Sequence, residues 1–234
     1  MSTSSLPRIA PPCGALLFDL DGTLVDSRRD IADALNIALE ATGREPLALE
    51  TVLTMIGDGA RALVARAIRL RTPAESSPEH DALLERVLAL FLQHYAERPA
   101  VHTALLPGAR EALSLGLPAA LVTNKPRAIT LLVLETLGIA SAFGAVFAGG
   151  DGPLKPSPHG LEQVARELGV PASRAWMIGD GPQDVLAGRA AGCFTIAVPG
   201  MIADRERVLA AEPHLIVESL HDVARLASAS RTSA

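Results

Sequence analysis

The sequence predicts an α/β protein in which a doubly wound parallel sheet carries an all-helical domain inserted after its first strand. Two observations predict this fold. Six short apolar runs are each followed by a segment of helical periodicity, the pattern of parallel strands joined by helices. Between the first and second runs, about 95 residues show helical periodicity without strand-like alternation. With 234 residues, the chain is long enough for one large domain and an insertion.

Six apolar runs predict the strands of the sheet, at residues 15–18, 119–122, 145–148, 175–178, 195–198 and 215–217. Parallel sheets of this type carry helices on both faces and bind ligands in a crevice beyond the carboxyl ends of the strands. The polar residues that directly follow these runs are therefore candidates for a functional site.

The segment between the first two runs predicts three helices. The first has an apolar stripe that includes Ile31 and Leu35, and it lies between Ser27, a residue suited to a helix start, and Gly43, suited to a helix end. Similar stripes occupy residues 63–68 and 83–95. We expect a core domain at 14–26 and 104–228, a helical domain at 27–103, and flexible termini at 1–13 and 229–234.

Composition argues against several classes of function. The net charge is −5 and the basic residues are scattered, so we expect no nucleic-acid partner. Cys13 and Cys193 are too far apart in sequence to indicate a disulfide framework or a cysteine-ligated metal, and they fit a reducing cytoplasm. The stretch 129–150 contains one charge, Glu135, but its pattern is that of a helix followed by a strand. We therefore predict a cytoplasmic protein without a membrane partner; the sequence does not indicate an oligomeric state.

Two carboxylates, Asp19 and Asp21, follow the first apolar run. Alternate residues of an extended strand point the same way, so both side chains could converge on one point, where their charges would require a cation. An acidic turn is the simpler interpretation. A calcium-binding loop also begins Asp-x-Asp, but Leu24 and Asp30 stand where that loop needs Gly and Glu.

Polar groups also follow later strands. Thr123 and Asn124 precede a predicted helix, where a hydroxyl and backbone amides could hold phosphate. Asp180 and Asp184 form a second acidic corner after the strand at 175–178. The sequence Gly179-x-Gly181 does not predict a dinucleotide loop, because Asp180 would face the pyrophosphate and Asp184 replaces the third glycine.

The two lysines of the chain provide an independent signal. Lys125 and Lys155 are its only lysines, whereas the other 19 of its 21 basic residues are arginines, and both lysines fall in these loops. A lysine is a compact point charge suited to phosphate. We therefore expect both lysine positions to need a compact charge that the larger arginine would not provide. The six histidines show no paired spacing with a carboxylate, so structural or solvated roles are favoured over zinc binding.

In these loops and their order, the chain resembles haloacid dehalogenase superfamily phosphatases, and within them the phosphoglycolate phosphatase branch. The resemblance extends from Gly14 to about Leu226 and includes the helical domain, which corresponds to the family's cap. Its most specific features are the segments 123–126, 149–156 and 188–193. It implies a Rossmann-like core and a small phosphorylated metabolite as substrate.

The resemblance implies a role for each loop residue. Asp19 is expected to form an aspartyl phosphate, while Asp21 protonates the leaving oxygen and then activates water. Magnesium is the expected cofactor, bound by the Asp19 carboxylate, the Asp21 backbone carbonyl and Asp180. The remaining implied roles are phosphate binding by Thr123, the Asn124 amide, Lys155 and the Gly22 amide, and orientation of Lys155 and metal-bound water by Asp184.

Two positions depart from the family pattern and leave the surroundings of the metal open. Gly181 stands where Ser or Thr is frequent, and Gln183 where Asn is frequent. In the predicted cap, Arg61 follows the glycine-flanked segment 56–60, and two interpretations have equal weight: a bidentate contact to a substrate carboxylate, or a solvated helix face.

Several alternatives can be weighed from the sequence. A phosphate-accepting receiver domain is disfavoured, because such domains lack an insertion between these loops. Asp21 disfavours a dehalogenase, and the absence of lysine from the predicted cap excludes a phosphonatase. A sugar phosphomutase stays open. For a phosphatase, 2-phosphoglycolate is the preferred substrate, followed by an amino-sugar phosphate, a nucleotide or pyrophosphate.

Overall fold

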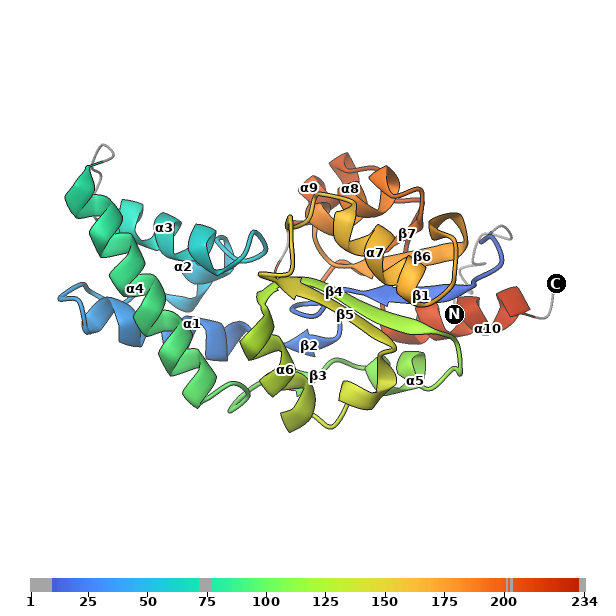
Figure 1. Ribbon diagram of the computed structural model, residues 1–234, viewed down its shortest axis with the longest axis horizontal. Helices are drawn as coiled ribbons and strands as arrows, with labels where there is room; N and C mark the ends of the chain where they lie inside the picture. The colour runs from blue at the N-terminus through green and yellow to red at the C-terminus, as the bar shows by residue number, and fades with distance from the viewer. Residues whose placement is uncertain (1–9, 72–76, 201, 203, 232–234) are drawn as a thin grey trace, which may run out of the picture.

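The computed structural model describes residues 10–71, 77–200, 202 and 204–231. These residues form a parallel sheet of six strands in the order β5-β4-β1-β6-β7-β8, flanked by helices, with a second lobe of helices at one end (Figure 1). The strands of the sheet are β1 (Ala15–Phe18), β4 (Ala119–Pro126), β5 (Ala145–Gly149), β6 (Ala175–Gly179), β7 (Phe194–Ala197) and β8 (Leu215–Ile216). All six apolar runs are therefore confirmed as strands, and so is the α/β fold class.

The residues of β1 show how the sheet is buried on both faces. Leu16 and Phe18 pack in the core cluster under helices α5 (Ala109–Leu113), α6 (Arg127–Thr136) and α10 (Leu220–Arg231). Leu17, which points the other way, packs with residues of α7 (His159–Glu167) and α8 (Pro182–Ala190). Helix α9 (Arg205–Ala210) lies beside α8 (Figure 1). The alternation along one strand thus builds the two hydrophobic layers that hold the sheet.

Helices α1 to α4 form the second lobe, which we call the cap (Figure 1). They are α1 (Arg28–Glu40), α2 (Leu49–Leu53), α3 (Ala60–Arg71) and α4 (Pro78–Glu97). The stripes predicted from sequence are buried in the cap, as Leu35, Val64 and Val87 show, each 0% exposed. The short helix α2 was not predicted, because five residues are too few for a periodic pattern.

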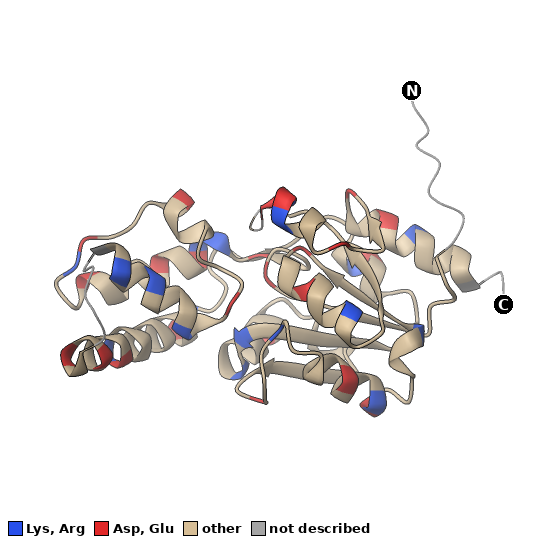
Figure 2. Cartoon of the chain, turned by 90° about the horizontal axis from the view of Figure 1, so that it is seen from above, with Lys and Arg blue, Asp and Glu red and all other residues tan. Residues whose placement is uncertain are grey.

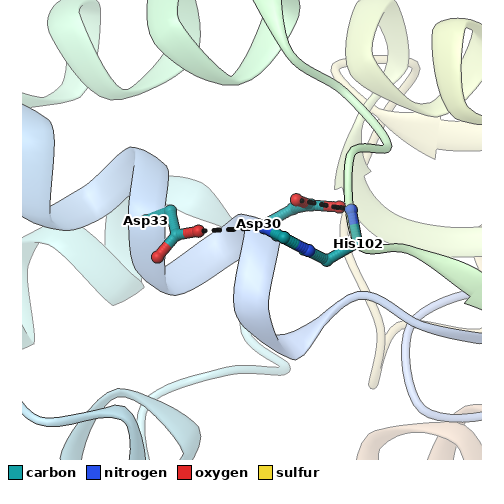
Figure 3. Close-up of side chains that lie close together, drawn as sticks. All are labelled: Asp30, Asp33 and His102. Carbon is teal, nitrogen blue, oxygen red and sulfur yellow. Dashed lines mark hydrogen bonds and ion pairs between the residues drawn. The ribbon is translucent and has the colours of Figure 1, made fainter.

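Two chain crossings join the cap to the sheet domain, and they lie side by side. Strands β2 (Val25–Asp26) and β3 (Ala104–Leu105) pair there in antiparallel fashion. Asp30 of α1 reaches across, and its carboxylate accepts a hydrogen bond from the His102 backbone amide at 3.0 Å (Figure 3). It also accepts hydrogen bonds from the Thr103 amide at 2.7 Å and the Thr103 hydroxyl at 2.6 Å. Both crossings are therefore fixed to each other at the base of the cap.

The chain ends differ in part from the sequence-based expectation. The predicted flexible tail begins inside α10, and the hydroxyl of Ser230 accepts a hydrogen bond from the Cys13 amide at 3.3 Å. Cys13 and Ser230 are both buried, so this contact joins the two ends of the described chain in the interior. Residues 1–9 and 232–234, also predicted to be flexible, lie outside the described residues.

Charged residues of both signs are interspersed over the two lobes (Figure 2). Among the described residues, no helix is both long and apolar enough to cross a bilayer. The apolar stretch at 129–150 is divided between α6, a short 3-10 turn and β5, as its sequence pattern predicts.

Candidate active site

The polar loops predicted from sequence meet at the carboxyl ends of β1, β4 and β6. A cavity of about 360 Å³ opens there between the sheet domain and the cap. Its walls include Asp19, Asp21, Thr123, Asn124, Lys155, Asp180 and Asp184. Residues far apart in the sequence converge because neighbouring parallel strands end at one edge of the sheet.

Lys155 lies at the centre of a buried charge cluster. Its ammonium donates hydrogen bonds to Asp19 Oδ1 and Asp184 Oδ1, both at 2.6 Å, and to the Val122 carbonyl at 2.7 Å. Burial opposes the charge, but the carboxylates of Asp184 and Asp19 raise the pKa of Lys155. The lysine is therefore a charged ammonium that holds two carboxylates of the site together.

Three carboxylates surround a single position beside this lysine. Oxygen atoms of Asp19, Asp180 and Asp184 all lie within 4.8 Å of one another. Burial raises the pKa of Asp19 to about 7, and burial followed by the charges of Asp19 and Asp184 raises the pKa of Asp180 well above its usual value. One oxygen, Asp180 Oδ2, is buried and receives no hydrogen bond from the described residues. An oxygen-only set with excess negative charge suits a hard divalent cation.

Gly22 has a different role from the one expected. Its backbone amide, predicted to bind phosphate, donates to the Val25 carbonyl at 2.8 Å. The residue adopts φ +88°, and a Cβ atom placed there would lie 2.3 Å from Asp180 Oδ2. Glycine is therefore required because the backbone turns here in the left-handed region and Asp180 packs directly against it.

Asp21 is held on two sides. Its Oδ1 accepts a hydrogen bond from the Ser27 hydroxyl at 2.6 Å, and the Lys125 ammonium lies 3.0 and 3.2 Å from its two carboxylate oxygens. Ser27 occupies the N-cap position of α1, as predicted, but its side chain makes no capping hydrogen bond. Its hydroxyl instead fixes a site residue at the first crossing into the cap.

The carboxyl end of β4, at residues 123–126, is also tied to its neighbours. The side chain of Asn124 accepts from the Lys155 amide at 2.8 Å and donates to the Lys155 and Gly57 carbonyls, both at 2.9 Å. The amide of Lys125 donates to the Thr123 hydroxyl at 3.2 Å. Asn124 thus joins the end of β4 to the loop that carries Lys155, and it also contacts the cap at Gly57.

Gln183, which stands where the family pattern frequently has Asn, makes another contact with the cap. Its amide donates to Asp58 Oδ1 at 2.8 Å, and the second oxygen of Asp58 pairs with Arg66. The Gly181 amide, at the other departure, donates to Asp184 Oδ2 at 2.9 Å. Gln183 therefore connects the acidic loop at 180–184 to the cap, and the Gly181 amide supports Asp184.

Comparison with known proteins identifies the family. The family model for haloacid dehalogenase-like hydrolases matches residues 13–192. The phosphoglycolate phosphatase of Chromobacterium violaceum is 40% identical over 195 residues, which cover 81% of this chain and 86% of that protein. The chain belongs to the haloacid dehalogenase-like hydrolase family.

Other members of this hydrolase family show the same relationship. The phosphoglycolate phosphatase of Photobacterium profundum is 36% identical over 91% of this chain and 96% of its own length. A solved structure from Haemophilus somnus, described as a predicted phosphoglycolate phosphatase, superposes with a TM-score of 0.84 at 26% identity, covering 92% of this chain and 98% of that chain. The similarity thus includes the cap as well as the sheet domain.

The structure does not bring Arg61 to the cavity. Its side chain is 59% exposed and pairs with Glu85 of α4 at 2.5 Å. It is not one of the residues that line the cavity. The position at the start of α3 directs Arg61 along the cap surface, so the solvated interpretation fits its contacts.

Two functional candidates were missed in the sequence. Tyr95 and Arg207 both line the cavity. Tyr95 belongs to an apolar stripe and was interpreted as cap core, although a buried hydroxyl needs a polar partner. Arg207 carries no sequence signal, because it is one of many arginines outside the recognisable loops.

Proposed function

We propose that this phosphatase of the haloacid dehalogenase-like hydrolase family converts 2-phosphoglycolate and water to glycolate and inorganic phosphate, through an aspartyl phosphate on Asp19. The observation that carries the proposal is the convergence of Asp19, Asp21, Asp180 and Lys155 on one cavity. The two relatives described above are named for this activity.

Asp19 would act as the nucleophile. One of its oxygens is held by Lys155, which fixes the carboxylate at the cavity wall. Attack on phosphorus forms the Asp19 acyl phosphate and breaks the bond to the substrate oxygen. Asp21 gives its proton to that leaving oxygen, then accepts a proton from the water that hydrolyses the acyl phosphate. Phosphate leaves and both aspartates return to their initial states.

Magnesium fits the donor set beside Asp19. The unpartnered Oδ2 of Asp180 and the close carboxylate oxygens support a cation at this position. Asp19, Asp180 and the backbone carbonyl of Asp21 would hold it, and Asp184 would orient its water. When bound, the ion would neutralise the repulsion between substrate phosphate and these carboxylates.

The phosphoryl group would be held opposite Asp19 by the hydroxyl of Thr123, the backbone amide of Asn124 and the ammonium of Lys155. Thr123 is buried and lines the cavity. Lys155 is already charged and fixed before substrate binds, since it is buried between Asp19 and Asp184. Preorganised positive charge of this kind stabilises the transition state without reorganisation at the moment of reaction.

The substrate carboxylate needs a cation that is not already paired. Of the described residues that line the cavity, Lys125, Lys155 and Arg207 are the basic ones. Both lysines form ion pairs with aspartates. Arg207, on α9, is exposed. Burial opposes the charge of Asp58, but hydrogen bonds from Arg66 and Gln183 lower the pKa of Asp58, and the charge of Arg207 adds a smaller effect in the same direction. We therefore assign carboxylate recognition to Arg207 rather than Arg61.

A panel of phosphomonoesters tests the function. The purified protein with Mg²⁺ should give its highest kcat/KM with 2-phosphoglycolate, ahead of amino-sugar phosphates, nucleotides and pyrophosphate. Phosphate transfer to a second hydroxyl of a sugar phosphate, detected as an isomeric sugar phosphate, would indicate a mutase instead. Absence of phosphate release from every ester would refute the proposal.

A further inference from the structure

A continuous set of buried contacts runs from the cap to Asp21. The ammonium of Lys125 contacts both carboxylate oxygens of Asp21 and donates a hydrogen bond to the hydroxyl of Tyr95. Tyr95 belongs to α4, whereas Lys125 lies near the end of β4 in the sheet domain. The Lys125 side chain is only 2% exposed. Water therefore has little access to this contact between the two domains.

The contacts of Lys125 differ from those of Lys155. Lys155 bonds Asp19 and Asp184, the carboxylates beside the expected metal, whereas Lys125 bonds Asp21. The Lys125 ammonium also lies 4.3 Å from the centre of the Tyr95 ring. Tyr95 thus interacts with the ammonium through both its hydroxyl and its aromatic ring. Lys125 is therefore committed to Asp21 and Tyr95 rather than to substrate phosphate.

The phenol and the ammonium have defined charges. Burial raises the pKa of Tyr95 to about 12, so the phenol is neutral at physiological pH. Burial opposes the charge of Lys125, but Asp21 and Tyr95 raise its pKa. Asp21 is the carboxyl group that contacts the Lys125 ammonium, and a buried ammonium without such a partner would be costly.

We propose that Lys125 and Tyr95 are positioning residues for Asp21. Lys125 fixes the direction of the Asp21 carboxylate, and Tyr95 fixes Lys125 only while α4 is docked on the sheet domain. Proton transfer to the leaving group thereby depends on the position of the cap. The inference rests on the proposed role of Asp21 as the acid.

The leaving group provides a readout specific to this role. Phenolate needs a proton to depart more than 4-nitrophenolate does, while the two phosphates have similar shapes. A poorly aligned acid should therefore slow the first substrate more than the second. A loss of packing or of substrate binding would affect both alike. The kcat/KM value reports the steps from substrate binding through formation of the phosphoenzyme, so it includes the step in which Asp21 donates its proton and excludes the later hydrolysis.

The experiment compares Tyr95→Phe, Lys125→Met and Asp21→Asn on phenyl and 4-nitrophenyl phosphate. Tyr95→Phe should lower kcat/KM for phenyl phosphate about 10-fold and for 4-nitrophenyl phosphate less than about 2-fold. Lys125→Met should show the same selectivity with losses of about 100-fold and a few-fold. Val87→Ala is the matched control, because Val87 is buried on α4 and does not line the cavity. It should lower thermal stability without changing the ratio of the two activities.

The outcomes separate the two claims. If Asp21→Asn reduces both substrates equally, Asp21 is not the acid, and the proposed mechanism and this inference both fail. If Asp21→Asn is selective but Tyr95→Phe reduces both substrates equally or neither, the positioning inference alone is overturned. Should Lys125→Met fail to fold, Tyr95→Phe still decides the question, since it removes one oxygen atom and keeps the ring.

Discussion

The metal-free protein should lose stability as pH rises from 5 to 8. Burial gives Asp19 a pKa of about 7 in the folded state, against 3.8 as its usual value. Between these values the folded protein binds a proton that the unfolded chain has released. The free energy of unfolding therefore falls as pH rises through this window. Asp180, whose pKa is also raised by burial, acts in the same direction.

The size of the effect follows from the two values. The difference between 3.8 and about 7 for Asp19 corresponds to at most about 4 kcal/mol of unfolding free energy, fully lost above pH 7. About 3 kcal/mol of this loss falls between pH 5 and 8, which for a chain of this size should lower the melting temperature by about 6 to 12 °C. Mg²⁺ should restore much of it at pH 8, because an ion that binds only the folded state stabilises it.

Thermal melts in chelator at pH 5, 6, 7 and 8, repeated with Mg²⁺ at pH 8, measure both effects. Asp19→Asn is the control. Asparagine cannot ionise, so this variant should reduce the pH dependence in chelator while Asp180 maintains the remainder. A wild-type melting temperature that stays constant or rises from pH 5 to 8 would refute the reasoning, as would a slope that Asp19→Asn leaves unchanged.

Three further predictions concern single residues. Lys155→Arg should lower kcat/KM at least about 10-fold despite its equal charge, because the larger planar group does not fit among three oxygens at 2.6–2.7 Å; wild-type kinetics would contradict this. Gly22→Ala should weaken the Mg²⁺-dependent rise in melting temperature, since its Cβ would displace Asp180; an unchanged Mg²⁺ response would count against the cation site. Arg207→Ala should raise KM for 2-phosphoglycolate about 10-fold or more while Arg61→Ala changes it less than about 2-fold, and the reverse order would return carboxylate recognition to Arg61.

The sheet and its loops could be predicted because their signals are local. Each strand is a short apolar run, and the ligand-binding edge follows from parallel topology, so the sequence alone places Asp19, Thr123 and Asp180 in one crevice. The lysines were informative for a similar reason: Lys125 and Lys155 stand out against arginine throughout the rest of the chain.

Contacts between the domains could not be predicted, because they depend on how the cap docks. Tyr95 is indistinguishable in sequence from the apolar stripe around it, and only the fold shows its hydroxyl beside Lys125. The same limit applies to Gln183 and Asp58. The family resemblance implied phosphate binding by the Gly22 amide, whereas the local turn uses that amide for a hydrogen bond to Val25.

Direct detection of the phosphoenzyme tests the central claim that Asp19 is the nucleophile. In Asp21→Asn, 4-nitrophenyl phosphate should still phosphorylate the protein, because its leaving group needs little protonation, while hydrolysis of the acyl phosphate is slowed by loss of the base. After rapid acid quench, mass spectrometry should find one phosphoryl group on the peptide that contains Asp19. A phosphoryl group on another residue, or continued turnover with no phosphorylated protein at any time point, would contradict the account.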